Sequence, residues 1–323
     1  MADFIAEAIE AGKKKAEEIL DGRRAAQVRR AAALQGHTQA MTMRIQTLTP
    51  AGLTPPSEVQ TAGFLAAVGD SWFDYPFHDV LKLLEDGYGY YVESTAHKGD
   101  PIEKIAYQGG QIDGFARKLE KIKARGAVPK AVLLSGGGDD VAGNEFGMLL
   151  NSAFSSIRGW NQDVVDGVLK DRIARAYVSL FSSLTSACQE HFKQTVPILV
   201  HGYDYPVPDG RGFLGGWPFP GPWLDPGFRE KNFKLEDSND LNQRVGMMKD
   251  VINQLNVMLK SVTSDPALSD VHCDVHYIDL RGTLSTDLKD DAYKEWWANE
   301  LHPTEKGFEK VTQKFEAELR ALP

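Results

Sequence analysis

The chain has 323 residues, of which 42% are hydrophobic and 25% are charged, a composition typical of a globular protein with a sizeable core rather than of a disordered chain. Its formal net charge of -9 argues against binding nucleic acid through broad neutralisation of phosphates, which needs a dominant positive surface. Two cysteines, Cys188 and Cys273, are too few for a disulfide framework or a four-cysteine metal site.

The N-terminal segment differs in composition from the rest of the chain. Residues 1–47 hold no proline, and their apolar residues recur at helical spacing, which predicts one or two amphipathic helices broken near Asp21-Gly22. The basic residues of this arm fit the solvated face of a helix packed on the main domain or on a second subunit, and they also fit docking on an anionic membrane. Three prolines within 48–61 predict a linker. Residues 1–61 are therefore expected to form an extension and residues 62–323 the main domain.

The start of the sequence lacks the basic segment, apolar core and cleavage site of a secretory signal. No run of residues approaches the roughly 18 apolar positions of a membrane span. We therefore expect a cytoplasmic protein.

From residue 63 onward, short apolar runs alternate with helical patterns, which is typical of strand-helix-strand units. The expected strands are residues 64–68, 88–93, 131–134, 196–201 and 275–280. The expected helices lie near residues 79–86, 101–125, 171–193, 239–263 and 304–321. The predicted fold class is α/β, a three-layer α/β/α domain around five parallel strands, in which ligands bind at the carboxyl ends of the strands.

Two insertions, residues 141–170 and 202–235, follow the third and fourth predicted strands. Both start at the carboxyl edge of the sheet, so we expect them to form lids or pocket walls. The second is crowded with Gly, Pro and aromatic residues. Its candidate substrate-binding residues are Tyr203, Tyr205, Trp217 and Trp223. A stiff apolar wall of this kind favours an acyl or aryl group. The same rings would also stack on a sugar, or would simply pack the insertion onto the domain.

Two positions predict nucleophilic chemistry. The first strand ends at Gly69 and delivers Ser71 into a turn, where its hydroxyl is exposed and its backbone N–H is available to an anion. Near the C-terminus, His302 precedes Pro303, and Thr304 resembles the N-cap of the last helix, so the imidazole is held on a short loop. A serine hydroxyl needs such a base because it is a poor nucleophile until its proton is removed.

Glycines follow the second and third strands, at Gly99 and at 136–138. Each of them alone fits a tight turn. Together with Ser71 they place backbone donors at three adjacent strand ends, as an oxyanion hole requires.

The four blocks, in this order, resemble the SGNH hydrolases, also called the GDSL esterase/lipase family. The matching blocks are Gly69-Asp70-Ser71, Gly99, Gly137-Gly138-Asp139-Asp140 and Asn299-Glu300-Leu301-His302. The resemblance covers roughly residues 63–321. It implies a flavodoxin-like sheet and hydrolysis of small-molecule esters without a metal or other cofactor. Its substrates range over lipids, acyl thioesters, acetylated sugars, peptidoglycan and aryl esters.

Two residues depart from the family pattern. Asp139 stands where the family has an oxyanion-hole asparagine, and Asn299 stands where it has the aspartate that orients the histidine. An ionised carboxylate would repel the oxyanion, so Asp139 helps only if protonated, a state that burial favours. Asn299 accepts a hydrogen bond from His302 but offsets no imidazolium charge. The candidate substitutes are Asp140, Asp290, Asp291 or Glu300 for the carboxylate, and Asn144 or a backbone amide for the donor.

The leading hypothesis is a serine esterase that forms an acyl-Ser71 intermediate, with His302 as base, Asn299 orienting its ring, and Ser71, Gly99 and Asp139 around the oxyanion. The alternatives are a binding or regulatory protein on the same fold, its catalysis weakened by these departures, and a carbohydrate acetyl esterase. A metal site at Asp70, Asp74, His78 and Asp79 is a minor option, because no histidine pairs stand at ligand spacing.

Overall fold

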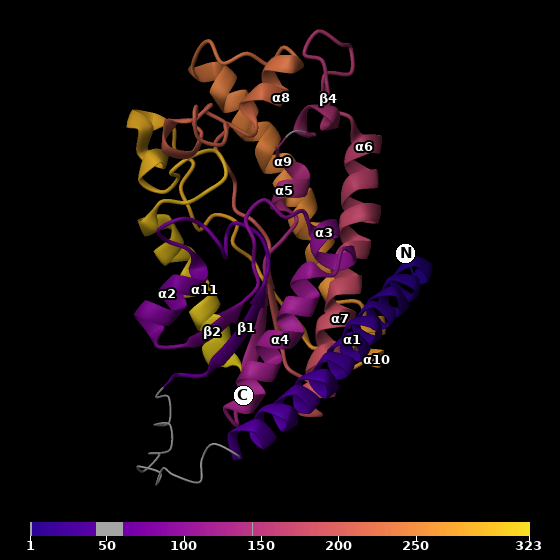
Figure 1. Ribbon diagram of the computed structural model, residues 1–323. Coiled ribbons are helices and arrows are strands. Elements are labelled where there is room, and N and C mark those ends of the chain that lie inside the picture. The colour runs from indigo at the N-terminus through magenta and orange to yellow at the C-terminus, as the bar shows by residue number, and fades with distance from the viewer. Residues whose placement is uncertain (1, 43–60, 144) are drawn as a thin grey trace.

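A five-stranded parallel sheet forms the centre of the computed structural model, which describes residues 2–42, 61–143 and 145–323 (Figure 1). The strands are β1 (Phe64–Val68), β2 (Tyr91–Ser94), β3 (Pro129–Leu134), β6 (Ile198–His201) and β7 (Val275–Ile278). They lie side by side in the order β2-β1-β3-β6-β7, and every neighbouring pair is parallel. Counted along the chain this is the 2-1-3-4-5 order of flavodoxin-like sheets, so the predicted fold class is confirmed.

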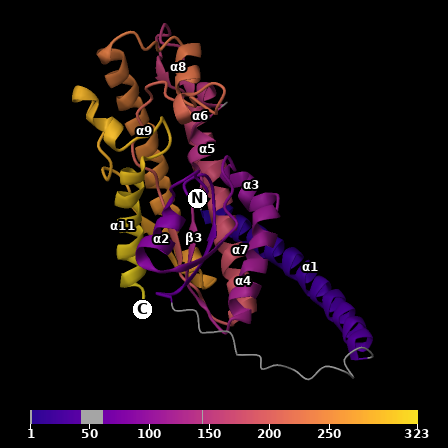
Figure 2. The same ribbon diagram turned by 60° about the vertical axis from the view of Figure 1, so that its left-hand side comes forward.

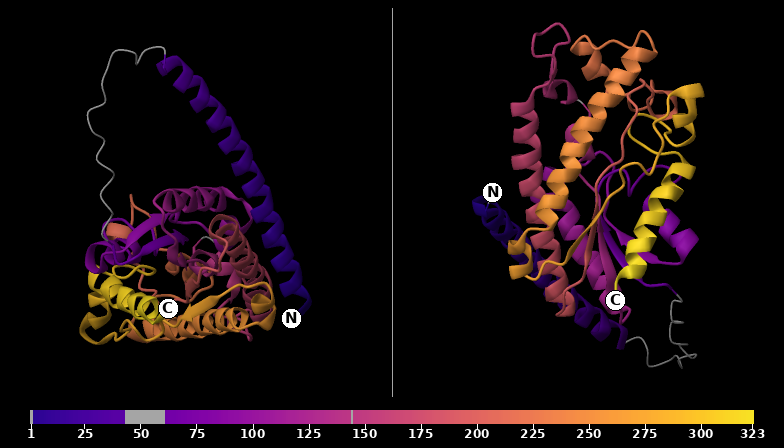
Figure 3. Two further views of the ribbon diagram at one scale, coloured as in Figure 1. Left: turned by 90° about the horizontal axis from the view of Figure 1, so that it is seen from below. Right: turned by 180° about the vertical axis from the view of Figure 1, so that it is seen from behind.

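Helices cover both faces of the sheet. The long ones are α1 (Ala2–Thr42), α2 (Val80–Tyr88), α4 (Gly110–Ala124), α7 (Ala174–Phe192), α9 (Ser238–Thr263) and α11 (Glu305–Ala321). The short ones are α3 (Ile102–Tyr107), α5 (Gly138–Val141), α6 (Gln162–Asp166), α8 (Asp225–Glu230) and α10 (Pro266–Asp270). Helices α4 and α7 pack on one face with α9 beside α7, and α2 and α11 pack together on the other (Figure 3).

The central strands read as uninterrupted apolar runs because both of their faces are covered. Residues 65–68 of β1 and residues 131–134 of β3 have no exposed surface. Sequence patterns of this kind mark strands well, and the predicted bounds of β1 are those observed.

Several of the predicted strands and helices begin or end at other residues than expected. Tyr88 does not begin a strand but ends α2, because Gly89 adopts a left-handed conformation (φ 76°) and its N–H caps the carbonyls of the last turn. The helix expected over 101–125 is two helices, separated at Gly109 (φ 80°). Helix α7 is preceded by a π-helical segment, Gly167–Ile173, that continues α6.

The first insertion carries a short hairpin, β4 (Leu150–Asn151) and β5 (Gly159–Trp160), at the carboxyl end of the sheet. The second carries α8. Figure 1 shows both above the strands, at the end of the molecule that the sequence pattern assigned to ligand binding.

The described part of the N-terminal arm, Ala2–Thr42, is one continuous helix, and the predicted break at Asp21-Gly22 is wrong. A Cβ at Gly22 would meet no atom within 4 Å, so this glycine is tolerated in an exposed helix at a cost of about 1 kcal/mol. The N-terminal half of α1 packs on α7, where Ser182 and Ser183 donate hydrogen bonds to the carbonyls of Ile9 and Gly12. Its later part leaves the body of the domain (Figure 2).

The basic residues of the arm are partly paired with the main domain. Arg23 makes two hydrogen bonds to Glu120, and Arg24 bonds Glu190. Packing on the main domain is thus one observed role of the arm, whereas contact with a membrane or a second subunit stays a prediction. Residues 43–47 of the predicted helical segment and 48–60 of the predicted linker lie outside the described part of the chain. Within that part, no helix has both the length and the apolar content that crossing a membrane would require.

Candidate active site

Ser71 stands in a tight turn at the carboxyl end of β1. The side chain of Asp70 accepts a hydrogen bond from the backbone N–H of Trp72 (3.0 Å). The backbone carbonyl of Asp70 accepts another from the backbone N–H of Phe73 (3.1 Å). Gly69 must lack a side chain, because a Cβ there would lie 2.8 Å from Ser135 on the neighbouring strand end. These constraints lift the Ser71 hydroxyl off the edge of the sheet.

His302 meets this serine across 231 positions of sequence. The distance from its Nε2 to Ser71 Oγ is 2.8 Å, and the distance from its Nδ1 to Asn299 Oδ1 is 3.1 Å. The loop is held because Thr304 caps α11 by accepting a hydrogen bond from the N–H of Gly307. The structure therefore brings the three predicted residues together.

Hydrogen bonding at Asn299 fixes the tautomer of the histidine. Asn299 Oδ1 accepts hydrogen bonds from the backbone N–H groups of Leu301 and His302, both at 3.0 Å, and Nδ2 donates to the Tyr75 hydroxyl. Because Oδ1 is thereby the acceptor, Nδ1 of His302 carries a proton and Nε2 presents its lone pair to Ser71.

Aromatic rings enclose the imidazole. The ring of Tyr75 stacks on His302 at 4.3 Å between centroids, and the ring of Trp223 meets it edge-on at 5.4 Å. This burial lowers the pKa of His302 to about 3, since the charged form is poorly solvated there. The histidine is consequently neutral, the form that a general base needs.

The ring nitrogens of His302 bond Asn299 and Ser71 and none of the candidate replacement carboxylates. Glu300 accepts hydrogen bonds from the backbone N–H groups of Gly210, Trp223, Leu224 and Asp225. It therefore ties both stems of the second insertion to the histidine loop, and burial raises its pKa to about 7.

Asp140 accepts a hydrogen bond from the N–H of Ile102, and Asp291 pairs with Lys294. Asp290 is exposed, and Asn144 lies outside the described residues. Asn299 is therefore the side chain that holds Nδ1 of His302.

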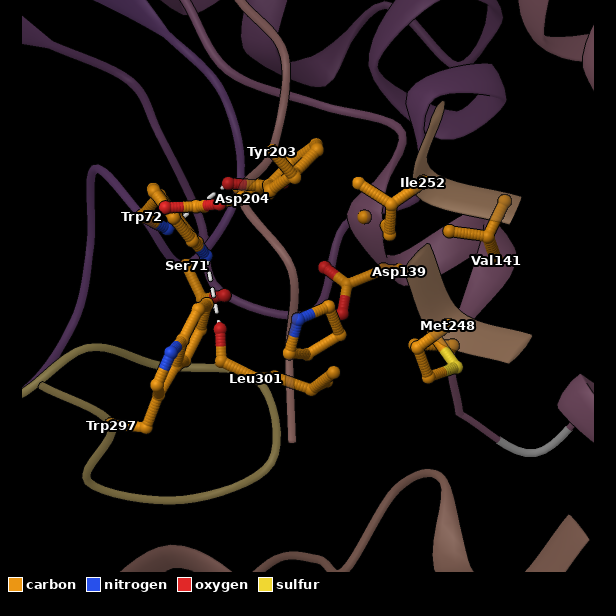
Figure 4. Close-up of a pocket in the computed structure, with 14 residues that line it drawn as sticks. Ser71, Trp72, Asp139, Val141, Tyr203, Asp204, Met248, Ile252, Trp297 and Leu301 are labelled. Carbon is orange, nitrogen blue, oxygen red and sulfur yellow. Dashed lines mark hydrogen bonds between the residues drawn. The ribbon is translucent and has the colours of Figure 1, made fainter. Parts of the chain in front are cut away.

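Asp139 lines the same cavity as Ser71 (Figure 4). Its Oδ2 atom is buried and has no hydrogen-bond partner among the described residues. Burial, and after it the charges of Asp70, Asp140 and Asp100, raise the pKa of Asp139 to about 8. At pH 7 this carboxyl is therefore protonated, and it is able to donate a hydrogen bond into the cavity.

The predicted backbone donors differ in placement. The N–H of Ser71 donates to no atom of residues 2–42, 61–143 or 145–323. Gly138 lines the cavity, whereas Gly99 lies in an exposed turn after β2 and does not. The geometry thus places Ser71, Gly138 and Asp139 around the cavity and leaves Gly99 outside it.

A buried polar network behind the serine escaped sequence analysis. Ser135 Oγ lies 2.5 Å from Asp70 Oδ1 and 2.8 Å from His201 Nε2, and the hydroxyl of Tyr203 donates to the other oxygen of Asp70. These bonds, with the one from the backbone N–H of Trp72, occupy both oxygens of the Asp70 carboxylate. The sequence offered only a serine and a histidine at strand ends, which is a weak signal.

The four predicted aromatic residues divide into two pairs. Tyr203 lines the cavity, and Trp223 contacts His302. Tyr205 instead bonds Asn253 through its hydroxyl, and the side chain of Trp217 is 95% exposed. Tyr205 and Trp217 do not line the cavity.

The minor metal option has little geometric support. Within the described ranges, no group of three or more His, Cys, Asp or Glu side chains is arranged to hold a metal ion. Asp79 serves as the N-cap of α2, and Asp74 accepts a hydrogen bond from the N–H of Lys98.

No family model matches the sequence, and no curated protein matches it. Among solved structures, the chain is similar to a lipase from a goat rumen metagenome, with 15% identity and a TM-score of 0.45, over 79% of this chain and 96% of that one. It is similar to a variant of an acetylxylan esterase from Geobacillus stearothermophilus (14%, 0.39, 81% and 96%). It is also similar to a GDSL-like lipase from Bacteroides thetaiotaomicron (10%, 0.36, 84% and 92%). Likenesses this distant leave the chemistry to be argued from the side chains of this chain.

Proposed function

We propose that this chain is a serine esterase that hydrolyses carboxylic esters through an acyl-Ser71 intermediate. The observation that carries the proposal is the unbroken hydrogen-bond chain from Ser71 Oγ through the ring of His302 to Asn299 Oδ1. A nucleophile, its base and a residue that orients the base stand at hydrogen-bonding distance, as acyl transfer requires.

In the first half-reaction, Ser71 Oγ attacks the carbonyl carbon of the ester and passes its proton to Nε2 of His302. The electron pair of the carbonyl moves onto its oxygen, which accepts hydrogen bonds from the N–H of Ser71 and from the protonated Asp139. Collapse of this intermediate expels the alcohol, which takes the proton from Nε2. Water then repeats the sequence on the acyl-serine and releases the carboxylic acid.

The mechanism has one weak step. When Ser71 transfers its proton, His302 becomes positively charged, and Asn299 offers it no negative charge. Asn299 does keep the productive tautomer, unlike an amide that donates to Nδ1. We therefore expect an active enzyme that is slower than one with a carboxylate at this position.

A binding or regulatory protein is the second candidate, and the missing carboxylate beside His302 favours it. The two candidates differ in whether Ser71 reacts. Ser71→Ala is expected to lower turnover of p-nitrophenyl acetate by roughly a thousandfold or more, while Ser156→Ala, at an exposed serine of the first insertion, keeps the wild-type rate.

A fluorophosphonate probe is expected to add its mass to the wild-type protein and not to the Ser71→Ala protein. Wild-type turnover in the Ser71→Ala protein would refute the assignment of the nucleophile. A wild-type protein with neither turnover nor labelling would establish the binding candidate instead.

A further inference from the structure

The cavity beside Ser71 is very small. Its volume is about 30 Å³, whereas a cavity needs about 10–15 Å³ to hold a single water molecule. Pockets that enclose whole organic ligands measure on the order of 300 to 1,000 Å³. The cavity therefore has room for one small group of a substrate and not for a chain of several carbons.

The wall opposite the nucleophile is apolar. It is formed by Val141 and Ala142, which follow β3, and by Met248 and Ile252 on α9, and all four side chains are buried. In the view of Figure 4, Asp139 lies between Ser71 and the side chains of Val141, Met248 and Ile252. Because Asp139 and these apolar side chains line one cavity with Ser71, an acyl group that enters it meets a hydrogen-bond donor for its carbonyl oxygen and apolar atoms for its alkyl part.

The part of this wall on α9 is held in place. Met248 and Ile252 are four residues apart, so they project from the same face of the helix. Helix α9 has 26 residues and packs on α7 and β7. One turn further on, Asn256 has no exposed surface and donates hydrogen bonds to the carbonyls of Tyr203 and Ile252. An acyl chain therefore cannot displace these side chains without disturbing the packing of α9.

We infer that this cavity is an acyl-binding pocket that accepts an acetyl group, and that Met248 and Ile252 set its limit on chain length. The inference rests on the proposed function. The apolar walls suit the methyl group, which needs no hydrogen bond. The alcohol half of the ester has no space in the cavity, so it must extend from Ser71 towards solvent. The substrate class is accordingly acetyl esters of larger alcohols.

The test compares kcat/KM for p-nitrophenyl acetate, butyrate, hexanoate and octanoate. For the wild-type protein we expect acetate to exceed hexanoate by roughly tenfold or more, the discrimination typical of a pocket that is too short. Met248→Ala and Ile252→Ala should each raise the hexanoate-to-acetate ratio by roughly tenfold. The matched control is Val257→Ala on the same helix, because Val257 is 61% exposed and its truncation should leave the ratio unchanged. Circular dichroism melting curves identify any variant that fails to fold.

A second measurement tests the size limit of the pocket independently of ester hydrolysis. Methanesulfonyl fluoride and octanesulfonyl fluoride both transfer their sulfonyl group to a reactive serine with loss of fluoride, and intact mass reports the rate. If Ser71 reacts faster with the smaller reagent, and if this preference is reversed in Met248→Ala, the result supports the acyl-binding pocket. A lack of ester turnover beside that result would refute the proposed function but not the pocket. Equal rates across both the ester series and the two reagents would overturn the inference and leave the esterase intact.

Discussion

The protonation of Asp139 makes the proposed mechanism testable through Asp139→Asn. In the proposed mechanism this carboxyl donates to the oxyanion only while it holds its proton, and its pKa is about 8. The fraction of protonated molecules falls from about nine tenths at pH 7 to about one tenth at pH 9, a tenfold loss of the active form. An amide at this position always donates, so the variant should have no alkaline limb.

The assay is kcat/KM for p-nitrophenyl acetate between pH 5 and 10, corrected for hydrolysis by the buffer. We expect the wild-type rate to be level from pH 5 to 7, because the pKa of His302 lies at about 3, and to fall about tenfold by pH 9. The Asp139→Asn rate should stay level throughout. Asp140→Asn removes one of the charges that raise the Asp139 pKa, so it should move the alkaline limb to lower pH. A limb that survives in Asp139→Asn would refute the reasoning, because another group would then be responsible.

The same titration predicts a change in stability. An ordinary aspartate has a pKa of 3.8, and Asp139 has one of about 8 in the folded protein, so between these values the folded state binds a proton that the unfolded state has lost. Stability therefore falls as the pH rises from about 4 to 8. Between pH 5 and 8 the loss amounts to at most about 4 kcal/mol, at about 1.4 kcal/mol per pH unit. The Tm of Asp139→Asn minus the Tm of the wild type should therefore increase as the pH rises from about 5 to 8. A difference that stays constant over this range would contradict the assigned pKa.

Three further predictions concern the histidine, the insertion and the arm. Asn299→Asp should raise kcat by at least about tenfold, because a carboxylate near the imidazolium is worth several kcal/mol, and it should raise the pKa of His302 so that an acid limb appears. A variant without an acid limb would show that the new carboxylate does not face the ring. Glu300→Gln should lower both kcat/KM and Tm, since an amide NH₂ cannot accept the backbone N–H groups that Glu300 binds, a loss of about 1–3 kcal/mol. Unchanged kcat/KM with a lowered Tm would limit Glu300 to a purely structural role. Gly12→Ala should lower Tm, because its Cβ would lie 2.2 Å from a carbonyl oxygen of α7, whereas Gly22→Ala on the same helix meets no atom within 4 Å and should raise Tm slightly. Shifts of the same sign in both glycine variants would contradict the docking of α1 on α7.

The parts of the fold that could be predicted are those in which one physical effect dominates. The buried strand 64–68 was correct because a run of apolar residues with helices on both sides has few other solutions. Helix ends were less predictable, since Gly89 and Gly109 end or separate helices through left-handed conformations that composition does not specify. Gly22 is the opposite case: a break in the helix was predicted there, but the helix continues on either side of this glycine.

The candidate site was predictable where residue types and their order carry the chemistry. Ser71, Asn299 and His302 meet as expected. Gly99 does not line the cavity, because a glycine after a strand indicates a turn without telling which way its N–H points. The sequence does not single out Tyr75, although this residue contacts both His302 and Asn299, because its role depends on the path of the chain after Ser71.

Asp139 and Asn299, the two departures from the pattern that the sequence resembles, are best understood together. A carboxyl stands where that pattern has the oxyanion-hole amide, and an amide stands where it has the carboxyl beside the histidine. At pH 7 both Asp139 and His302 are neutral, so the charges that matter are those that develop during attack, an imidazolium and an oxyanion on either side of Ser71. The amide of Asn299 stabilises the first less than a carboxylate would. The carboxylic acid of Asp139 is a stronger donor than an amide, and it stabilises the second more. The gain and the loss act on the same transition state and partly cancel. In the proposed mechanism, a site built from neutral partners works only while Asp139 keeps its proton, so the expected esterase activity is confined to pH values below about 8.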